Sequence, residues 1–423
     1  MFMKKFLQKL LYFLAKIILN KYQPEIIGIT GSVGKTSTKE AIYAVLKDKF
    51  DIRTNIKNYN TEFGVPLTII NAKSGRKNIL KWLLVYAKAF QLILFKTPYP
   101  KILILEMAAD HPGDIEYLTN LAPCQVAVIT AIGPTHLEFF ETLENVIKEK
   151  QFLITHLAEN SHAVLNADDN LVLPLKEKTK ARVITHGLNN DSLLKAENIV
   201  YEKDSGGVAC NISYHSENCQ AHFQNVLAVS QISSLLAAVA VGKIYDLSLA
   251  EIIKSLEDFK FPKGRLQLLP GIKNTLIIDD TYNSSPKAVK AALEVLSRLE
   301  CGGRRWAILG DMLELGGYSE TAHEEAGEWV KEYKVDILVT VGERSKSTAR
   351  VAEINGLAPE RVVSFDNYFD AGKFVQNEIS EGDLILIKGS QGMRMEHIVK
   401  EIMAGPEHAG ELLVRQEKEW VEK

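Results

Sequence analysis

Hydrophobic positions along the chain alternate between short apolar runs and longer amphipathic segments. From Pro24 onward, apolar runs of four to seven residues are separated by segments with an apolar residue every three or four positions. This alternation is typical of parallel strands joined by crossover helices. The strands expected in the first half of the chain are 25–30, 102–106, 126–132, 163–166 and 183–186.

The pattern changes after residue 195. Apolar and polar residues alternate singly over 195–225, which predicts antiparallel strands at 209–214 and 219–223. Helical periodicity follows at 230–245 and 249–256. Pro262 and Gly264 then punctuate a linker over 259–265.

Beyond the linker the alternation of strands and helices resumes, which predicts a second α/β unit of about 160 residues. The expected strands are 276–280, 306–309, 337–341 and 384–388. The expected helices are 285–299, 320–332, 345–354 and 367–379. Residues 411–423 mix charges of both signs, and we expect a solvent-exposed end there.

The amino-terminal segment has a separate pattern. Residues 1–23 contain five lysines and no acidic residue: Lys4, Lys5, Lys9, Lys16 and Lys21. No small-residue cleavage site follows, and Lys9 and Lys16 interrupt the apolar positions, so neither a signal peptide nor a spanning helix fits. We expect a basic amphipathic helix.

A second apolar segment, 79–95, carries lysines at its flanks and is expected to form another helix. Since the strands 25–30 and 102–106 should be neighbours, we expect the two helices to pair as a hairpin-like patch with lysines at its rim. Two interpretations stay open. Either the helices pack against the protein core, or they rest on the inner leaflet of a membrane.

Composition and charge narrow the functional classes. The 423 residues are 46% hydrophobic and 24% charged, which excludes a disordered or coiled-coil chain. A formal charge of −3 gives no overall basic field for nucleic acid. The four cysteines lack metal-binding spacing, as is typical of a reduced cytoplasmic protein.

The strongest candidate site is a glycine-rich turn between an expected strand and an expected helix. It comprises Gly31, Ser32, Val33, Gly34, Lys35, Thr36 and Ser37. Such a turn directs backbone amides and the positive end of the helix at phosphate, while the lysine binds outer phosphates and the threonine hydroxyl binds Mg²⁺. Ile29 replaces the first glycine of the eight-residue pattern, so the match is to its shorter form.

Two further residues end apolar runs, where an open α/β sheet places its ligands. Glu106 is a candidate ligand for Mg²⁺, and His136 follows a Gly-Pro turn. Taken alone, each has a simpler interpretation, as a surface carboxylate and as a hydrogen-bonded loop histidine.

Eight motifs, in this order, resemble those of the Mur ligase family, in particular its D-alanyl-D-alanine-adding branch. They are TGSVGKT (30–36), NTEFGVPLT (60–68), EM with HPGDI (106–107, 111–115), IGPTHLE (132–138), LNADD (165–169), DDTYN (279–283), LGDMLELG (309–316) and KGSQGMRME (388–396). The resemblance covers about 24–402. It implies an α/β fold, with a P-loop central domain on a mostly parallel sheet and a smaller Rossmann-like α/β carboxy-terminal domain. The implied divisions are 1–23, 24–262 with an apolar helical insertion at 78–97, and 263–423.

The resemblance also implies roles for individual residues. Lys35, His136 and Lys150 would be catalytic, and Lys150, fourteen residues after His136, would be carbamylated by CO₂. Thr36, Glu106, His136 and Lys150 would bind two Mg²⁺ ions. ATP would be held by Gly31 to Ser37 together with Arg265, Asp280 and Asn283, and substrate by Asn60, Thr61, Lys388, Ser390 and Arg394. Without the family, Lys150 reads as a solvated lysine, and Lys148 is the competing candidate.

The implied activity is ATP-dependent formation of an amide between a UDP-linked muramoyl peptide and D-alanyl-D-alanine, by a cytoplasmic monomer that binds no nucleic acid. The sequence departs from the family in three respects. The apolar segment 79–95 looks like an insertion ahead of the Glu106 strand. Only about 23 residues precede the expected core, where the family has a UDP-binding domain, and Ser234 replaces an adenine-contacting amide, with Gln231 nearby. Two alternatives remain, a folylpolyglutamate-like ligase and a membrane-associated pseudoenzyme that binds nucleotide.

Overall fold

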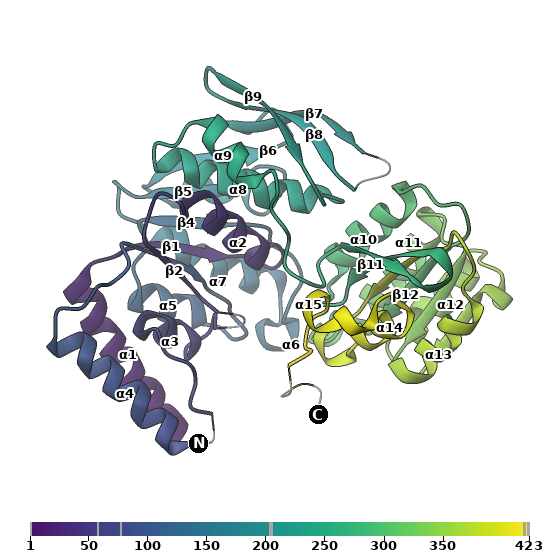
Figure 1. Ribbon diagram of the computed structural model, residues 1–423, viewed down its shortest axis with the longest axis horizontal. Helices are drawn as coiled ribbons and strands as arrows, with labels where there is room; N and C mark the ends of the chain where they lie inside the picture. Colours follow the sequence, from purple (N-terminus) through teal and green to yellow (C-terminus); the bar gives the residue numbers. More distant parts are fainter. Residues whose placement is uncertain (1, 57–58, 77, 203–205, 418–419, 421–423) are drawn as a thin grey trace.

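The structure, a computed structural model, describes residues 2–56, 59–76, 78–202, 206–417 and 420, with only the backbone for residues 2–5. Residue 1 and residues 421–423, the ends of the expected amino- and carboxy-terminal segments, lie outside the described residues. Two β-sheets divide the described chain, with a helical pair at one end (Figure 1).

The larger sheet has nine strands among the described residues, in the order β2-β3-β1-β4-β5-β6-β7-β8-β9. The first six in chain order run parallel: β1 (Glu25–Thr30), β2 (Ile52–Thr54), β3 (Ile102–Glu106), β4 (Val126–Ile129), β5 (His162–Asn166) and β6 (Arg182–Gly187). The strand β7 (Leu194–Tyr201) also pairs parallel with β6, and β8 (Val208–Tyr214) and β9 (Glu217–Phe223) then extend the sheet by antiparallel pairing. The parallel strands read as continuous apolar runs because helices cover both of their faces.

Both faces of this sheet are packed by helices. In β3, Leu103 and Leu105 join one buried cluster, whereas Ile102 and Ile104 join the other. The first cluster is covered by α1 (Phe2–Tyr22), α3 (Gly64–Ile70), α4 (Ile79–Leu94), α5 (Asp114–Leu121), α6 (Leu137–Phe140) and α7 (Leu143–Thr155). The second cluster is covered by α2 (Lys35–Leu46), α8 (Val229–Ile244) and α9 (Leu249–Leu256).

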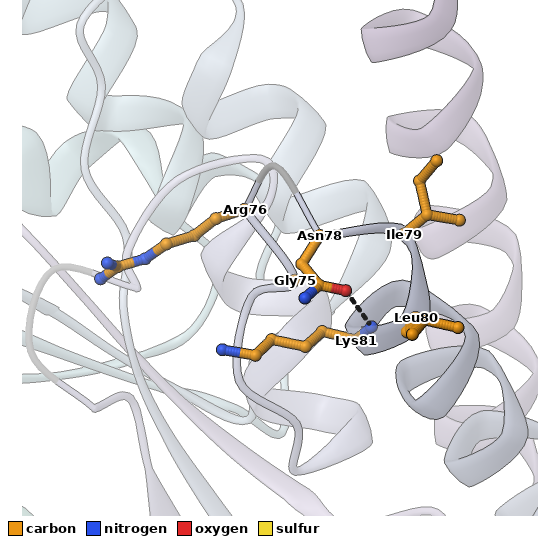
Figure 2. Close-up of a pocket in the computed structure, with 6 residues that line it drawn as sticks. All are labelled: Gly75, Arg76, Asn78, Ile79, Leu80 and Lys81. Carbon is orange, nitrogen blue, oxygen red and sulfur yellow. Dashed lines mark hydrogen bonds between the residues drawn. The ribbon is translucent and has the colours of Figure 1, made fainter.

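The helices α1 and α4 lie side by side at the end of the molecule, which confirms their expected pairing (Figure 1). Lys21 Nζ donates hydrogen bonds to the carbonyls of Leu92 and Ile93, each at 2.9 Å. At the start of α4, the Asn78 side chain accepts a hydrogen bond from the backbone N–H of Lys81 and caps the helix (Figure 2). Among the described residues, no helix combines the length and the apolar character needed to cross a bilayer.

The smaller sheet, of six strands within the described residues, has the order β10-β11-β15-β12-β13-β14. Its strands are β10 (Gln267–Gly271), β11 (Thr275–Asp280), β12 (Arg305–Gly310), β13 (Ile337–Val341), β14 (Val362–Phe365) and β15 (Leu384–Lys388), of which β10 pairs antiparallel and the others parallel. One face packs on α10 (Pro286–Arg298), α11 (Ser319–Glu332) and α12 (Lys346–Ile354), the other on α13 (Tyr368–Glu378) and α14 (Glu396–Ile402). The expected fold class, a parallel α/β unit followed by a smaller one, is confirmed.

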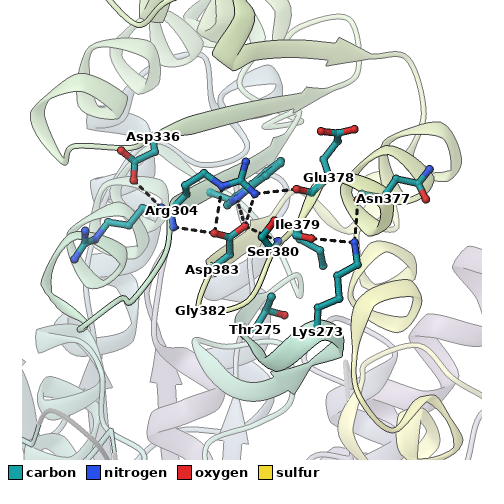
Figure 3. A network of polar contacts seen from close by, with 12 residues as sticks. Lys273, Thr275, Arg304, Asp336, Asn377, Glu378, Ile379, Ser380, Gly382 and Asp383 are labelled. Carbon is teal, nitrogen blue, oxygen red and sulfur yellow. Dashed lines mark hydrogen bonds and ion pairs between the residues drawn. The ribbon is translucent and has the colours of Figure 1, made fainter.

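A buried carboxylate ties together the amino ends of strands in the smaller sheet (Figure 3). Asp383 accepts hydrogen bonds from Arg304 Nη2 at 2.7 Å, from Trp306 Nε1 at 2.9 Å and from the backbone N–H of Ser380 at 2.9 Å. Burial raises the pKa of Asp383, but the hydrogen bonds from Arg304 and Ser380 outweigh it and hold the pKa below its ordinary value. The network joins β12, β15 and the end of α13, and its role is structural.

Part of the sequence-based description was wrong. The carboxy-terminal end, expected in solvent, packs through Leu413 and Arg415. The Arg415 guanidinium binds the Glu396 carboxylate at 2.8 Å and the carbonyls of Thr281 and Tyr282. Glu396 is fully buried, and a buried carboxylate requires a charged partner, which this segment supplies.

Candidate functional site

The glycine-rich turn forms where β1 ends and α2 begins. Gly31 has φ 148°, and a Cβ there would lie 2.1 Å from Thr130 Oγ1, so no other residue fits. Gly34, with φ 91°, precedes Lys35, the first residue of α2. The remaining loop residues make the following contacts: Ser32 Oγ with the Gly133 backbone, the Val33 carbonyl with Thr130 Oγ1, and Ser37 with the buried side of α2. The turn holds the free amides of the first helical turn open to an anion.

Lys35 lies over this loop. Its Nζ donates hydrogen bonds to the carbonyls of Gly31 at 2.7 Å and Ser32 at 3.3 Å. Burial lowers the pKa of Lys35, with Arg265 acting in the same direction and Glu106 and Asp110 opposing it. A half-buried cation held only by carbonyls would gain a stronger partner in a phosphate oxygen.

Glu106, at the end of β3, has one oxygen bound and one free of partners. Its side chain is 2% exposed, and Oε1 accepts a hydrogen bond from Asn60 Nδ2 at 2.9 Å. Within the described residues, the buried Oε2 has no hydrogen-bond donor. Asn60, expected at the substrate, therefore holds the carboxylate in place, while Thr61 accepts the backbone N–H of Val65.

The oxygen donors around Glu106 suit a hard divalent cation. A buried carboxylate oxygen without a donor is costly unless a cation binds it, and Thr36 offers a hydroxyl on the adjoining loop. In the part of the chain that is described, no three His, Cys, Asp or Glu side chains are arranged to hold a metal ion. A metal here would therefore need oxygen ligands from Thr36, from the nucleotide or from a modified lysine.

Lys150 lies inside this region, and Lys148 lies outside it. Both are on α7, but Lys150 is 3% exposed, whereas Lys148 is exposed to solvent. Burial, reinforced by the charge of Lys35 and opposed by Glu149 and Asp110, lowers the pKa of Lys150 to about 7. A substantial fraction of its amine is therefore neutral at neutral pH.

His136 faces two carboxylates that the sequence did not identify. Its Nδ1 lies 2.8 Å from Glu314 Oε2, and its Nε2 lies 3.6 Å from Asp110 Oδ1. The contact with His136 holds the pKa of Glu314 below its ordinary value, although burial acts in the opposite direction. Glu314 belongs to the LGDMLELG motif and Asp110 lies between two other motif segments, so the motifs marked the region without giving these roles.

Contacts between the two α/β units converge on the same place. Arg265 Nη2 donates to Thr36 Oγ1 at 3.1 Å, and its guanidinium lies 4.2 Å from the centre of the Tyr282 ring. Lys287 Nζ, on α10, donates to Asp169 Oδ2 at 3.0 Å and to the Ile132 carbonyl at 2.6 Å. Together with Glu314, these residues close the carboxy-terminal unit over the glycine-rich loop.

The other expected ligand residues bind one another. Asp280 and Lys388 form a buried ion pair at 2.6 Å, and Lys388 also donates to the Asn283 carbonyl at 2.9 Å. Ser390 Oγ accepts the backbone N–H of Leu313 at 2.9 Å, and Arg394 Nε donates to Glu396 at 2.8 Å. Their expected roles toward ribose and dipeptide stay predictions.

Two residues considered for adenine are likewise engaged within the protein. Gln231 Oε1 accepts the backbone N–H groups of Leu227 at 2.6 Å and Ala228 at 3.1 Å. Ser234 Oγ donates to the Ser230 carbonyl one helical turn earlier. The amide oxygen of Gln231 is therefore already bound, and Ser234 has no amide to offer an adenine base.

A glycine-rich phosphate loop on a parallel sheet, closed by a second α/β unit, is the arrangement of a nucleotide-dependent enzyme. The chain belongs to the Mur ligase family. The Mur ligase middle domain matches residues 29–80 and 87–242, and the Mur ligase, glutamate ligase domain matches residues 264–391.

Particular relatives are ligases of one type. The chain is 30% identical over 393 residues to UDP-N-acetylmuramoyl-tripeptide--D-alanyl-D-alanine ligase of Bacillus subtilis, covering 93% of this chain and 79% of that protein. It is 27% identical over 383 residues to the enzyme of the same name from Synechocystis, covering 90% and 74%.

Comparison with solved structures gives the same result as the sequence relatives. MurF ligase from Thermotoga maritima in complex with ADP superimposes with a TM-score of 0.77 at 28% identity, covering 93% of this chain and 83% of that one. Folylpolyglutamate synthase from Mycobacterium tuberculosis, with a TM-score of 0.63 at 15% identity, covering 91% and 93%, shares the fold alone.

Proposed function

We propose that this protein is an ATP-dependent, ADP-forming ligase of peptidoglycan precursor synthesis that joins D-alanyl-D-alanine to the carboxylate of a UDP-linked muramoyl tripeptide. The observation that carries the proposal is the similarity to the Bacillus subtilis ligase over 93% of the chain. Lys35 over the loop and the buried carboxylate of Glu106 support the proposal, and they disfavour a pseudoenzyme.

The proposed reaction has two steps. A carboxylate oxygen of the tripeptide attacks the γ-phosphorus of ATP, and ADP leaves, which gives an acyl phosphate. The amine of D-alanyl-D-alanine then attacks the acyl carbon, loses a proton, and expels phosphate. Such a reaction needs positioning and charge neutralisation rather than a protein nucleophile. Lys35, the loop amides and Arg265 are suited to hold the phosphates.

Magnesium and a carbamylated lysine belong to the same proposal. Thr36, Glu106, His136 and Lys150 would hold two Mg²⁺ ions, which would offset the charge on the phosphate oxygens. Carbamylation joins the neutral Lys150 amine to CO₂ with loss of a proton, and it makes the side chain an anionic oxygen ligand. The pKa of Lys150, lowered to about 7 by burial, favours this modification. Asp280 and Asn283 would adjoin the nucleotide, and Lys388, Ser390 and Arg394 the dipeptide.

We further propose that the ligase is a cytoplasmic monomer that touches the inner face of the plasma membrane through residues 1–23 and 79–95. The functional divisions would be 1–23, 24–262 for ATP and metal, and 263–423 for closure and the dipeptide. The pairing of α1 with α4 at one end of the molecule supports this division (Figure 1).

Phosphate release tests the activity. The full-length protein is assayed with ATP, Mg²⁺ and D-alanyl-D-alanine, with a UDP-linked muramoyl tripeptide or its UDP-free counterpart as acceptor. We expect release that requires both the acceptor and the dipeptide. Lys35→Ala should abolish it while the thermal melting curve is retained. Release that instead requires glutamate would assign the protein to the folylpolyglutamate-like alternative.

A further inference from the structure

One face of α4 is apolar and uncovered. Its large side chains point away from the core and are each more than half exposed, from 51% for Phe90 to 77% for Ile79. The outer face of α4 comprises Ile79, Leu80, Leu83, Leu84, Phe90 and Leu94. At 100° per residue these positions span about 140° of the helix, so they form one continuous stripe. Exposed apolar surface of this extent marks an interaction site.

The partner helix is built differently. In α1, the residues Leu11, Leu14, Ala15 and Ile18 are buried against the first cluster of the large sheet. Lys21 and Tyr22 of α1 hold the end of α4 through its main-chain carbonyls. The helix α1 therefore packs against the sheet and holds α4 in place, and the uncovered apolar face belongs to α4.

The two chain segments that carry α1 and α4 have charges of one sign. Residues 1–24 and 63–105 contain twelve lysines and arginines and no acidic residue, although the whole chain has a formal charge of −3. Lys81 and Lys88 lie about 40–60° beyond Leu84 on the helical projection, at one edge of the stripe. At the start of α4, Arg76 and Lys81 extend to the side opposite Ile79 and Leu80 (Figure 2).

We infer that the outer face of α4 docks on the surface of an anionic lipid bilayer, with α4 parallel to the membrane plane. A helix of 16 residues is about 24 Å long, shorter than the roughly 30 Å hydrocarbon core, so it lies on the bilayer rather than across it. Its apolar side chains enter the acyl region, and the surrounding cations meet lipid phosphates. This inference refines the proposed membrane contact and is independent of the ligase chemistry.

The positive charge of these segments favours a lipid surface over a second copy of the chain as the partner of the outer face of α4. A dimer through this face would bring two acid-free, basic segments together, and like charges facing each other oppose association. The helix pair also lies at the end of the molecule away from the smaller sheet (Figure 1). Docking therefore leaves the contacts between the two α/β units free to open and close.

Vesicle sedimentation tests the apolar contact. The full-length protein is mixed with vesicles of phosphatidylcholine containing a quarter phosphatidylglycerol, or of phosphatidylcholine alone. We expect binding to the anionic vesicles, reduced at least tenfold in the double variant Leu80→Gln/Leu84→Gln. The matched control is Ile354→Gln/Phe369→Gln, which replaces two exposed apolar residues of the smaller α/β unit and should bind as the unchanged protein does.

A charge reversal tests the electrostatic contact. Lys81→Glu should weaken anionic vesicle binding about 25-fold, at about fivefold for each unit of charge, whereas Lys254→Glu on α9 should have no effect. Equal binding to neutral vesicles, or no vesicle binding, would overturn the inference. So would a dimer in sedimentation velocity that Leu80→Gln/Leu84→Gln dissociates. Ligation measured without vesicles should be the same in both α4 variants as in the unchanged protein. If the unchanged protein itself shows no ligation, that result counts against the proposed function and leaves the membrane inference untouched.

Discussion

At the scale of single residues, Lys150 is the position where burial has the clearest chemical consequence. Its neighbour Lys148 shares the helix and the side-chain type but remains in solvent. The resemblance to the Mur ligase family pointed to Lys150, fourteen residues after His136, and the fold explains why that amine can lose its proton.

Replacing Lys150 tests its part in the reaction. Lys150→Ala should lower ligation at least a hundredfold, because the proposed carbamate could no longer form, and a short-chain carboxylate in excess should restore part of it. Phosphate release measures both effects. The control Lys148→Ala should keep full activity. Full activity in Lys150→Ala would remove this lysine from the mechanism.

The lowered pKa of Lys150 also predicts a pH dependence of stability. Between pH 7 and the ordinary lysine pKa of 10.5, the unfolded chain holds a proton on this amine that the folded protein has partly released. Stability should therefore rise with pH in this window, by about 2 kcal/mol between pH 7 and 9. Urea denaturation at both pH values measures the rise. Lys150→Met should remove it, and an unchanged rise in that variant would assign the effect to other groups.

Glu314 is one of the two carboxylates that the structure adds beside His136. Glu314→Gln replaces the carboxylate 2.8 Å from His136 Nδ1 with a neutral amide, and loss of such a charged contact typically costs about 1.5–3 kcal/mol. We expect kcat to fall between about tenfold and a hundredfold, with the melting temperature little changed. Glu343→Gln, at an exposed carboxylate of the same unit, is the control. An unchanged kcat in Glu314→Gln would make the contact incidental.

Some of these residues could be predicted from the sequence, and others could not. The residues of the glycine-rich loop are contiguous, and its chemistry depends on local backbone geometry. Its motif was therefore sufficient to predict the position and shape of the loop. Asp110 and Glu314 come from different α/β units and meet only through tertiary packing. The burial of Asp280 with Lys388 likewise depends on the pairing of β11 with β15.

At the scale of elements, strands covered on both faces were predicted well because they read as apolar runs. Four expected strands agree with β1, β3, β13 and β15, namely 25–30, 102–106, 337–341 and 384–388. The strands β2, β10 and β14 were missed: β2 has three residues, β10 contains Pro270, and β14 is only half-buried. The strand β7 lies in the region expected to be antiparallel but was not predicted as a separate strand. Periodicity predicted α1 and α4 but gave no indication of which of their apolar faces would stay uncovered.

Two adjacent residues of α1 test whether this helix packs against the large sheet. Leu14→Ala should destabilise the protein by about 2–5 kcal/mol, because Leu14 is buried in the core. Phe13→Ala, at an exposed position, should cost less than about 1 kcal/mol. Urea denaturation compares the two. Equal effects would mean that α1 does not pack as the structure describes.

At the scale of the whole molecule, the two α/β units meet over the glycine-rich loop through Arg265, Lys287 and Glu314. Each contact joins a residue of the carboxy-terminal unit to the loop region of the large sheet. Opening these contacts would admit substrates, and closing them would exclude water from an acyl phosphate. The helix pair at the opposite end leaves this motion unobstructed.

The central claim is that a carboxylate is activated by phosphoryl transfer and then captured by D-alanyl-D-alanine. An acceptor tripeptide labelled with ¹⁸O in its reacting carboxylate tests this claim most directly, with mass spectrometry of the peptide and the released phosphate. The account predicts one ¹⁸O atom in phosphate for each amide formed, with ADP as the other product. Unlabelled phosphate, or AMP with pyrophosphate, would contradict it.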